Sequence, residues 1–235
     1  MRAVVFDFFG TLTDPGIEGG RRDAAAVTAA ALGVPAAAFW AAMVASFTER
    51  ITGVHGGTRD VLREMARRCG VEPGEVRLDA AVEAHHHGSV PLWKPRPGAL
   101  ELLAALRGRG LRLAVLSDCG AELCQGWAGT PYAPLVDATV FSWQEGTRKP
   151  DPRLYAAAAE RLRTAADECW YVGDGGSREH QGALAAGMRP VLVTNAGYPG
   201  AGRHRDDPDP YVPADLIDDL PQLLALTNAW DRRLQ

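Results

Sequence analysis

The sequence predicts an α/β protein in which a helical domain is inserted early into the chain of a parallel-sheet domain. Short apolar runs typical of buried strands alternate with helical patterns over most of the chain, an order that favours a parallel sheet with helices on both faces. By contrast, about eighty residues near the N-terminus carry helical patterns and no strand, too many for a simple crossover between two strands.

Five apolar runs rich in β-branched and aromatic residues predict the strands. Such runs are typical of strands that are buried on both faces of a sheet. In chain order they are RAVVFDFF near the N-terminus, LRLAVLS ending at Ser117, ATVFS ending at Ser142, CWYVGD ending at Asp174 and RPVLVTN ending at Asn195.

Three helical patterns separate the later strands. PGALELLAALRGRG closes on Gly110, and DPRLYAAAAERLR begins with Asp151 as the expected N-cap and Pro152 in the first helical position. SREHQGALAAGM begins at Ser177, a second expected N-cap, and ends near Gly187. The tail YPGAGRHRDDPDPYVPAD is rich in Pro, Gly and Asp and predicts a surface loop before a last helix.

The helical insertion is predicted from four alanine-rich segments: RRDAAAVTAAALG, AAAFWAAMVASFTERITG, TRDVLREMARRCG and VRLDAAVEAHHHG. Because none of them reads as a strand, we predict a helical domain over residues 15–93. The α/β domain then comprises residues 1–14 and 94–235.

Composition narrows the possible partners. The chain of 235 residues has a net charge of −4, so no basic surplus favours nucleic acid or an anionic membrane surface. Its four cysteines form no CxxC pair, and no apolar run approaches the ~20 residues of a membrane span. We expect a cytoplasmic protein without a signal peptide, a monomer or a homodimer, that acts on a small molecule.

Polar side chains stand where the predicted strands end. Asp7, Ser117 and Asp174 each close an apolar run, and Lys149 follows the third run by a few residues. Ligands of an open parallel sheet bind outside the carboxyl ends of its strands, so these four side chains should meet at one place.

The predicted cluster suits phosphate chemistry. Two carboxylates side by side repel each other unless a cation lies between them, and hard oxygen ligands favour Mg²⁺. A lysine, a serine and the backbone N–H groups of the turn Phe9-Gly10-Thr11 would surround phosphate oxygens. A carboxylate next to the metal can attack phosphorus and form an aspartyl-phosphate, and Asp7 is the best nucleophile in the chain.

These motifs, in this order, resemble those of the haloacid dehalogenase-like (HAD) hydrolase superfamily. Its first motif, D-x-D-x-T, matches Asp7 to Thr11 except at the third position, and its second, a strand ending in Ser or Thr, matches Ser117. The third, a lysine often followed by proline, matches Lys149, and the fourth, GD followed by a second acid, matches Asp174 with Glu179.

The resemblance implies a Rossmann-like core, a helical cap inserted after the first motif, and a role for each matching residue. Asp7 would be the nucleophile and a Mg²⁺ ligand, together with the carbonyl of Phe9 and the carboxylate of Asp174, and Glu179 would hold the metal through water. Ser117 and Lys149 would bind the transferring group, and Thr11 would brace the loop. The expected substrate-binding set also includes Gly10, Asp118 and Arg50.

Phe9 departs from the family pattern. The family's phosphatases carry an aspartate there, which protonates the leaving oxygen, and general acid–base help of this kind increases the rate by about 10²–10⁴-fold.

Three hypotheses about function follow from the aromatic residue at this position. The protein is a Mg²⁺-dependent phosphatase whose acid comes from elsewhere, or whose leaving group needs none; candidate donors are Asp14, Glu49 and His85 to His87. Alternatively it resembles the 2-haloacid dehalogenases, which carry an aromatic residue there but lack the GD of the fourth motif, or it is a catalytically impaired binding domain.

Overall fold

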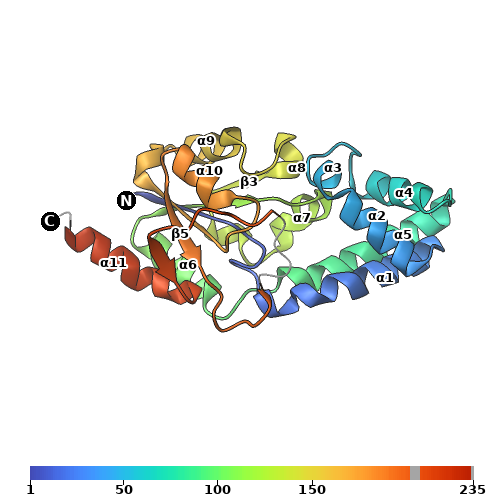
Figure 1. Ribbon diagram of the computed structural model, residues 1–235, viewed down its shortest axis with the longest axis horizontal. Coiled ribbons are helices and arrows are strands. Elements are labelled where there is room, and N and C mark those ends of the chain that lie inside the picture. The colour runs from blue at the N-terminus through green and yellow to red at the C-terminus, as the bar shows by residue number, and fades with distance from the viewer. Residues whose placement is uncertain (202–206, 234–235) are drawn as a thin grey trace.

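The computed structural model describes residues 1–201 and 207–233, and six strands in this part of the chain form one parallel sheet (Figure 1). The spatial order is β3-β2-β1-β4-β5-β6. The strands are β1 (Ala3–Phe6), β2 (Arg112–Ser117), β3 (Ala138–Phe141), β4 (Cys169–Gly173), β5 (Arg189–Val193) and β6 (Asp215–Ile217). The N-terminal strand therefore lies in the interior of the sheet, flanked by β2 and β4.

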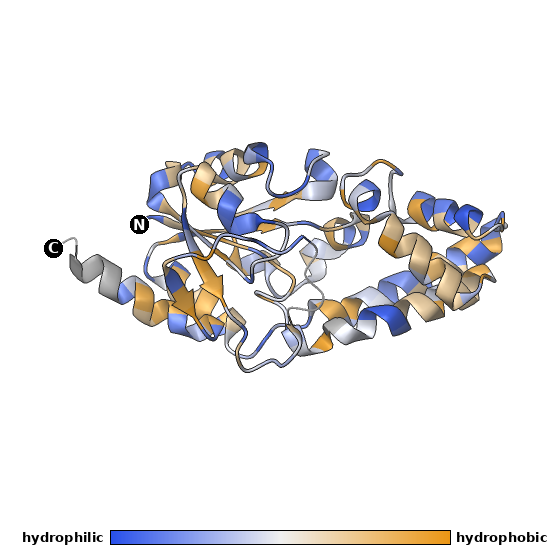
Figure 2. Cartoon of the chain, in the orientation of Figure 1, coloured by the Kyte–Doolittle hydropathy of each residue, from blue (hydrophilic) through white to orange (hydrophobic). Residues whose placement is uncertain are grey.

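Both faces of the sheet are buried under helices, as the continuous apolar runs predict. In β1, Val4 and Phe6 join a core with α6 (Ala99–Gly108) and α11 (Leu223–Arg233), whereas Ala3 and Val5 face α9 (Pro152–Arg161) and α10 (Glu179–Ala185). Figure 2 shows the apolar strands enclosed between helices whose outer sides are hydrophilic. The predicted α/β class is confirmed.

Two strand predictions need correction. The third strand ends at Phe141, because Ser142 already begins the short helix α8 (Ser142–Glu145). The strand β6 is not predicted by the sequence pattern: it begins at Asp215, the last residue of the predicted loop, and continues beyond it. Its three residues pair with β5 at the edge of the sheet, and so short a run carries no detectable period of its own.

The two predicted N-caps have different outcomes. Asp151 caps α9 as expected: its side chain accepts a hydrogen bond from the backbone N–H of Arg153, and Pro152 occupies the first turn. The prediction for Ser177 is wrong, because α10 begins two residues later, at Glu179. Ser177 and Arg178 both have left-handed backbone conformations, with φ of 54° and 49°.

Five helices follow β1, and four of them, all but the short third helix, pack around a core of their own away from the sheet (Figure 1). The five helices are α1 (Arg21–Leu32), α2 (Ala36–Ala45), α3 (Phe47–Ile51), α4 (Thr58–Arg68) and α5 (Glu75–Ser89), flanked by 3₁₀ helices at Pro15–Gly20 and Val90–Trp93. This helical region corresponds to the expected cap, although the exact domain limits stay a prediction. The segment AAAFWAAMVASFTERITG is not one helix but breaks at Ser46, whose buried hydroxyl bonds back to the carbonyl of Ala42.

The chain leaves and re-enters the α/β core at one place. Thr13 and Pro95 form an isolated antiparallel bridge, and the Asp14 N–H donates to the carbonyl of Lys94 at 2.9 Å. The two chain connections between the core and the helical region are therefore hydrogen-bonded to each other, at the end of the loop that carries Asp7.

A second contact, which we call the side contact, joins the helical region to the core around α8. The hydroxyl of Ser142 donates to the carbonyl of Ile51 at 2.7 Å, and the indole N–H of Trp143 donates to the carbonyl of Gly56 at 2.8 Å. Between them, Gly53 has a φ of 75°, and a Cβ there would lie 2.9 Å from the carbonyl oxygen of Trp143. The side contact thus attaches the helical region to the core at a place separate from the two chain connections.

We expect Ser142→Ala to lower the free energy of unfolding by about 1–3 kcal/mol, because the carbonyl of Ile51 and the N–H of Cys119 both lose their bond to this hydroxyl. Urea denaturation measures the effect. Ser89→Ala is the matched control, since the Ser89 hydroxyl bonds only to a carbonyl one turn back in its own helix. Equal stability of the two variants would contradict a stabilising side contact.

In the described residues, no single helix is long and apolar enough to cross a membrane; α1 and α2 meet that test only as a pair, with a bend of 115° between them.

Candidate active site

The carboxyl ends of the central strands bring three of the predicted motifs together. The ammonium group of Lys149 lies 2.6 Å from Oδ1 of Asp7 and 2.7 Å from Oε2 of Glu179. Oxygen atoms of Asp7, Asp174 and Glu179 all lie within 4.8 Å of one another, and all three residues are buried. Ser117, from the second motif, is fully buried at the end of the neighbouring strand β2.

Lys149 is the charge partner of this cluster. Burial alone would lower the pKa of Lys149, but the carboxylates of Asp7 and Glu179 raise it well above its usual value. The phenol oxygen of Tyr171 lies a further 3.3 Å from the ammonium group. Lys149 therefore stays charged and offsets part of the repulsion between the acids.

Asp7 is held by both of its carboxylate oxygens. Oδ1 accepts from Lys149, and Oδ2 accepts from the hydroxyl of Thr11 at 3.0 Å. Burial raises the pKa of Asp7 to about 8, and the carboxylates of Glu179 and Asp174 add to the rise although Lys149 opposes it. One lysine is thus insufficient to neutralise the three acids.

The donor set fits a divalent cation. Three buried carboxylates supply hard oxygen ligands, and a bound Mg²⁺ would offset the repulsion by which Glu179 and Asp174 add to the effect of burial on the pKa of Asp7. Gly10 matters for this arrangement: its φ is 75°, and a Cβ there would meet Oδ2 of Asp174 at 2.9 Å. Any larger residue would push the first and fourth motifs apart.

Glu179 is fixed by partners that the motif does not reveal. Its Oε2 accepts from Tyr171 at 2.8 Å and its Oε1 from the N–H of Gly175 at 2.8 Å, while the phenol of Tyr155 donates to its backbone carbonyl. The preceding left-handed residues, Ser177 and Arg178, cost on the order of 1–3 kcal/mol each. The loop is therefore strained, and in this strained conformation the carboxylate of Glu179 lies against Lys149.

Ser117 and Asp118 differ in what they offer a substrate. The hydroxyl of Ser117 is buried and has no hydrogen-bond partner among the described residues, as suits a group that receives a ligand oxygen. Asp118 instead accepts from the backbone N–H of Lys149 at 3.0 Å, and its Oδ2 lies 3.4 Å from Nε of Arg148. Its carboxylate orients the third motif, so a direct role in substrate binding stays a prediction.

Gly10 and Arg50 also have contacts other than those expected. The N–H of Gly10 donates to the hydroxyl of Thr13 at 3.0 Å, so this residue serves the site by its small size. Arg50 donates to the carbonyl of Met43 through Nε and Nη2, and to the hydroxyl of Ser46. These bonds hold the break between α2 and α3, and the role of Arg50 toward a substrate stays a prediction.

Phe9 lies half-buried beneath an arginine of the helical region. Its ring packs edge-on against Phe8, with the centroids 5.1 Å apart, and the guanidinium carbon of Arg21 lies 4.6 Å from its centroid. The position that carries an acid in the family pattern is thus occupied by an aromatic ring and a cation.

Most of the candidate replacement acids are engaged elsewhere. Asp14 accepts from the N–H of Gly16, and Glu49 accepts from His55 and from Arg68 on the exposed side of the helical region. His86 and His87 are exposed, whereas His85 is half-buried, and burial lowers its pKa although Glu122 opposes this. The ring of His86 packs edge-on against the buried Trp93, with the centroids 6.0 Å apart.

A buried arginine below the nucleophile loop was not predicted. Arg96 donates to the carbonyl of Thr11 at 3.1 Å and to the side chain of Asn195 at 2.9 Å, and it pairs with Asp219. The amide of Asn195 in turn donates to the carbonyl of Gly10 at 2.9 Å. Asn195 could have been identified from sequence, because it follows a strand at the same edge of the sheet.

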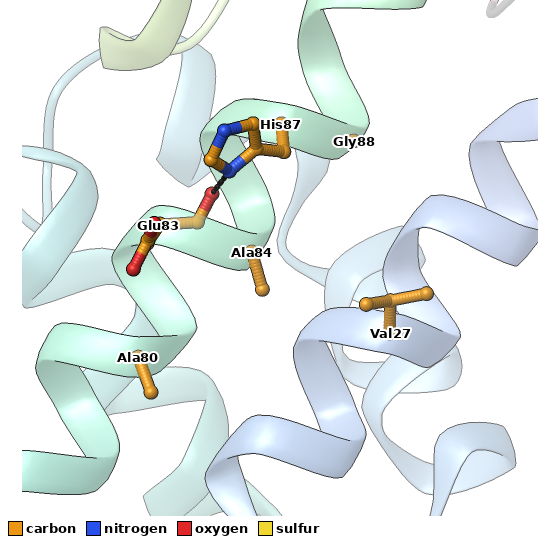
Figure 3. A pocket seen from close by; sticks show the side chains of 6 residues that line it. All are labelled: Val27, Ala80, Glu83, Ala84, His87 and Gly88. Atoms are coloured by element: carbon orange, nitrogen blue, oxygen red, sulfur yellow. Dashed lines mark hydrogen bonds between the residues drawn. The ribbon is translucent and has the colours of Figure 1, made fainter.

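A pocket of about 510 Å³ lies between α1 and α5, away from these residues (Figure 3). Val27, Ala80 and Ala84 form its apolar side, and His87 contacts the carbonyl of Glu83 at its rim. His87, one of the candidate acid donors, lines this pocket, but none of the residues of the cluster around Asp7 does, so the pocket does not belong to the candidate active site.

Comparisons with known proteins agree with the fold and the motifs. A family model described as haloacid dehalogenase-like hydrolase matches residues 1–187. The chain therefore belongs to the haloacid dehalogenase-like hydrolases, and the sheet, the helical insertion and the motif order are those of this family.

Two curated relatives carry phosphatase names. The glyceraldehyde 3-phosphate phosphatase of Methanopyrus kandleri is 31% identical over 159 residues, covering 66% of this chain and 68% of the relative. The phosphoserine phosphatase of Thermus thermophilus is 32% identical over 158 residues, covering 66% and 62%. The matched stretches thus span about two thirds of the length of these relatives.

Solved structures match over nearly the whole chain. The 2-haloacid dehalogenase from Pseudomonas syringae pv. Tomato DC3000 has a TM-score of 0.70 at 26% identity, covering 98% of this chain and 99% of that one. The HAD phosphatase from Thermococcus onnurineus has a TM-score of 0.66 at 19% identity, covering 97% and 98%, a likeness of fold alone.

Proposed function

We propose that this hydrolase is a Mg²⁺-dependent phosphatase that acts on a small organic phosphate through an aspartyl-phosphate on Asp7. The observation that carries the proposal is the cluster of Asp7, Asp174 and Glu179, of which Asp7 and Glu179 contact Lys149. When all are ionised, the three buried acids and the one ammonium group leave two negative charges, which one divalent cation would balance. The phosphatase names of two relatives support this choice.

In the proposed reaction a carboxylate oxygen of Asp7 attacks phosphorus, and the leaving oxygen departs with the electrons of the broken P–O bond. Lys149 and the unpartnered hydroxyl of Ser117 stabilise the charge on the phosphoryl oxygens, and Thr11 holds Asp7 in place. Asp7, the carbonyl of Phe9, Asp174 and, through water, Glu179 would hold Mg²⁺, which would supply electrostatic stabilisation of the same charge. Water then hydrolyses the aspartyl-phosphate, which releases phosphate and restores the carboxylate.

The surroundings of Phe9 select the leaving group. Since no acid is present at this position, we infer that good substrates are aryl or acyl phosphates, whose leaving oxygen needs no proton. The guanidinium of Arg21 above the ring can stabilise the developing negative charge but cannot donate a proton at neutral pH.

The test is a phosphatase assay on metal-stripped protein with p-nitrophenyl phosphate and acetyl phosphate, with and without Mg²⁺. The proposal expects turnover that needs the metal, and a phosphoenzyme on Asp7 that can be trapped by acid quench. Turnover that is unaffected by chelators, or the absence of turnover in a protein that binds Mg²⁺, would overturn it.

We expect Phe9→Asp to raise kcat on alkyl phosphates by about 10²-fold, because it supplies the missing acid, and to change aryl phosphates little. A series of aryl phosphates with graded leaving-group pKa measures this directly: the dependence of kcat/KM on that pKa should be steep in the wild type and shallow in the variant. Phe9→Asn is the control, because asparagine has the same size as aspartate but cannot act as a general acid. A drop in activity in Phe9→Asp alone would indicate that another donor acts or that the ring is needed.

The 2-haloacid dehalogenase activity is the second candidate, favoured by the aromatic Phe9 and by the full-length likeness to the Pseudomonas syringae enzyme. Asp174 speaks against it, because a third carboxylate beside Asp7 and Glu179 favours a metal-dependent site. Metal-independent release of chloride from 2-chloropropionate would establish this alternative.

A further inference from the structure

We infer that Asp209, in the segment between β5 and β6, is a positioning residue for the metal-binding acids of the fourth motif. The inference rests on the proposed metal role of Asp174 and Glu179. The side chain of Asp209 is only 2% exposed, although it belongs to a stretch rich in proline and aspartate that the sequence predicts as a surface loop.

The first observation is that α10 lacks a cap from its own flanking residues. Its first residue is Glu179, and Arg178 before it is left-handed and makes no side-chain cap bond. Oδ2 of Asp209 accepts instead from the N–H groups of His180 at 2.6 Å and Gln181 at 2.9 Å. These are the second and third residues of the helix, whose N–H groups a normal N-cap side chain would bind.

The second observation is that the same residue holds the loop on the other side of the strained turn. The backbone N–H of Asp209 donates to the carbonyl of Gly175 at 2.9 Å. Gly175 follows Asp174 directly, and its own N–H donates to Oε1 of Glu179. Asp209 thus contacts both Gly175, which follows Asp174, and His180, which follows Glu179.

The third observation concerns the turn itself. Ser177 and Arg178 are consecutive non-glycine residues in the left-handed region, so their conformation is sterically unfavourable and needs support from outside the turn. The N–H of Arg178 donates to the carbonyl of Asp207, two residues before Asp209. We conclude that the segment 207–209 keeps the turn in the form that directs Glu179 toward Lys149 and Asp7.

The test compares Asp209→Ala with Asp207→Ala, its control. Asp207 lies in the same segment, but its side chain makes an exposed ion pair with Arg178, and its supporting carbonyl remains in the variant. The readouts are the Kd of Mg²⁺ by calorimetry on metal-free protein, the melting temperature without metal, and kcat and KM as functions of Mg²⁺ concentration.

We expect Asp209→Ala to weaken Mg²⁺ binding at least tenfold, as loss of a group that orients metal ligands typically does. The lowered kcat should recover at high Mg²⁺ with KM little changed, whereas Asp207→Ala should stay within twofold of the wild type. Amide exchange at His180 and Gln181 should become faster only in Asp209→Ala. A lower melting temperature with unchanged Mg²⁺ affinity, or equal effects of the two variants, would overturn the inference.

Asp209→Asn serves as the conservative variant and decides the matter if Asp209→Ala does not fold. Asparagine can still cap α10 through its one oxygen but no longer accepts from the N–H of Tyr211 as well. We expect Mg²⁺ affinity about threefold weaker than in the wild type; unchanged affinity would overturn the inference. A wild type that binds Mg²⁺ but hydrolyses no phosphate would refute the proposed function and leave this inference standing, and one that binds no Mg²⁺ would refute both.

Discussion

Asp7→Asn should abolish turnover, with kcat lower by roughly 10⁴-fold or more, the scale on which removal of a nucleophile acts in enzymes with covalent intermediates. The amide keeps the shape of the carboxylate: its one oxygen can still accept from Lys149, and its NH2 group can donate to the hydroxyl of Thr11, so the loop should stay in place. What it loses is the nucleophilic oxygen and one of three negative charges. Steady-state kinetics and acid-quench trapping of the phosphoenzyme measure both consequences.

The same variant should be at least as stable as the wild type in the absence of metal. Burial raises the pKa of Asp7 to about 8 and the other two acids add to this rise, so an ionised Asp7 is unfavourable in the folded protein, and the neutral amide removes that cost. Thermal melting in EDTA checks this expectation. Residual activity within tenfold of the wild type, with a normal fold, would show that Asp7 is not the nucleophile.

Lys149→Met should have the second largest effect, on both stability and catalysis. Methionine has a similar length but no charge, so Asp7 and Glu179 would face each other without their shared cation. Breaking a buried ion pair by removal of one partner typically costs about 3–5 kcal/mol. We also expect kcat to fall by about 10²–10³-fold, because a positive group aimed at the phosphoryl oxygens is lost.

The chain provides its own control for this substitution, since it contains only two lysines. Lys94 is mostly exposed, with 66% of its side chain accessible, and lies 3.7 Å from Asp14. Lys94→Met should change the free energy of unfolding by less than about 0.5 kcal/mol. Urea denaturation of both variants, with and without Mg²⁺, separates the two cases; equal stability of the two would contradict a central role for Lys149.

Much of the site could be predicted because parallel strands impose a simple rule. Residues at the carboxyl ends of strands share one edge, so Asp7, Ser117 and Asp174 could be placed near one another from the apolar runs alone. The rule depends only on where each run ends. It applied to Asn195 as well, whose contact with the Gly10 carbonyl belongs to the same edge of the sheet.

Other features depend on contacts between segments that carry no local signal. Tyr171 lies inside an apolar strand, where its hydroxyl could not be distinguished from packing, and Arg96 resembles any basic residue between helices. Ser177 satisfied the local pattern of an N-cap, but Asp209 supplies that function from a distant segment. A local rule fails where a residue far along the chain competes for the same N–H groups.

The side contact has a consequence for how this enzyme can acquire new substrates. In two of its hydrogen bonds, those from Ser142 and Trp143, the helical region contributes only main-chain oxygens, of Ile51 and Gly56. Every amino acid has such an oxygen, so Ile51 can be exchanged without loss of its hydrogen bond to the core, whereas Gly53 and Gly56 have left-handed backbone conformations that favour glycine. Two other contacts with the core use side chains of the helical region, Thr58 with Gln125 and Thr48 with Arg148. A library randomised over this region that keeps these two threonines, Gly53 and Gly56 should therefore yield folded variants, whose substrate preferences can then be compared.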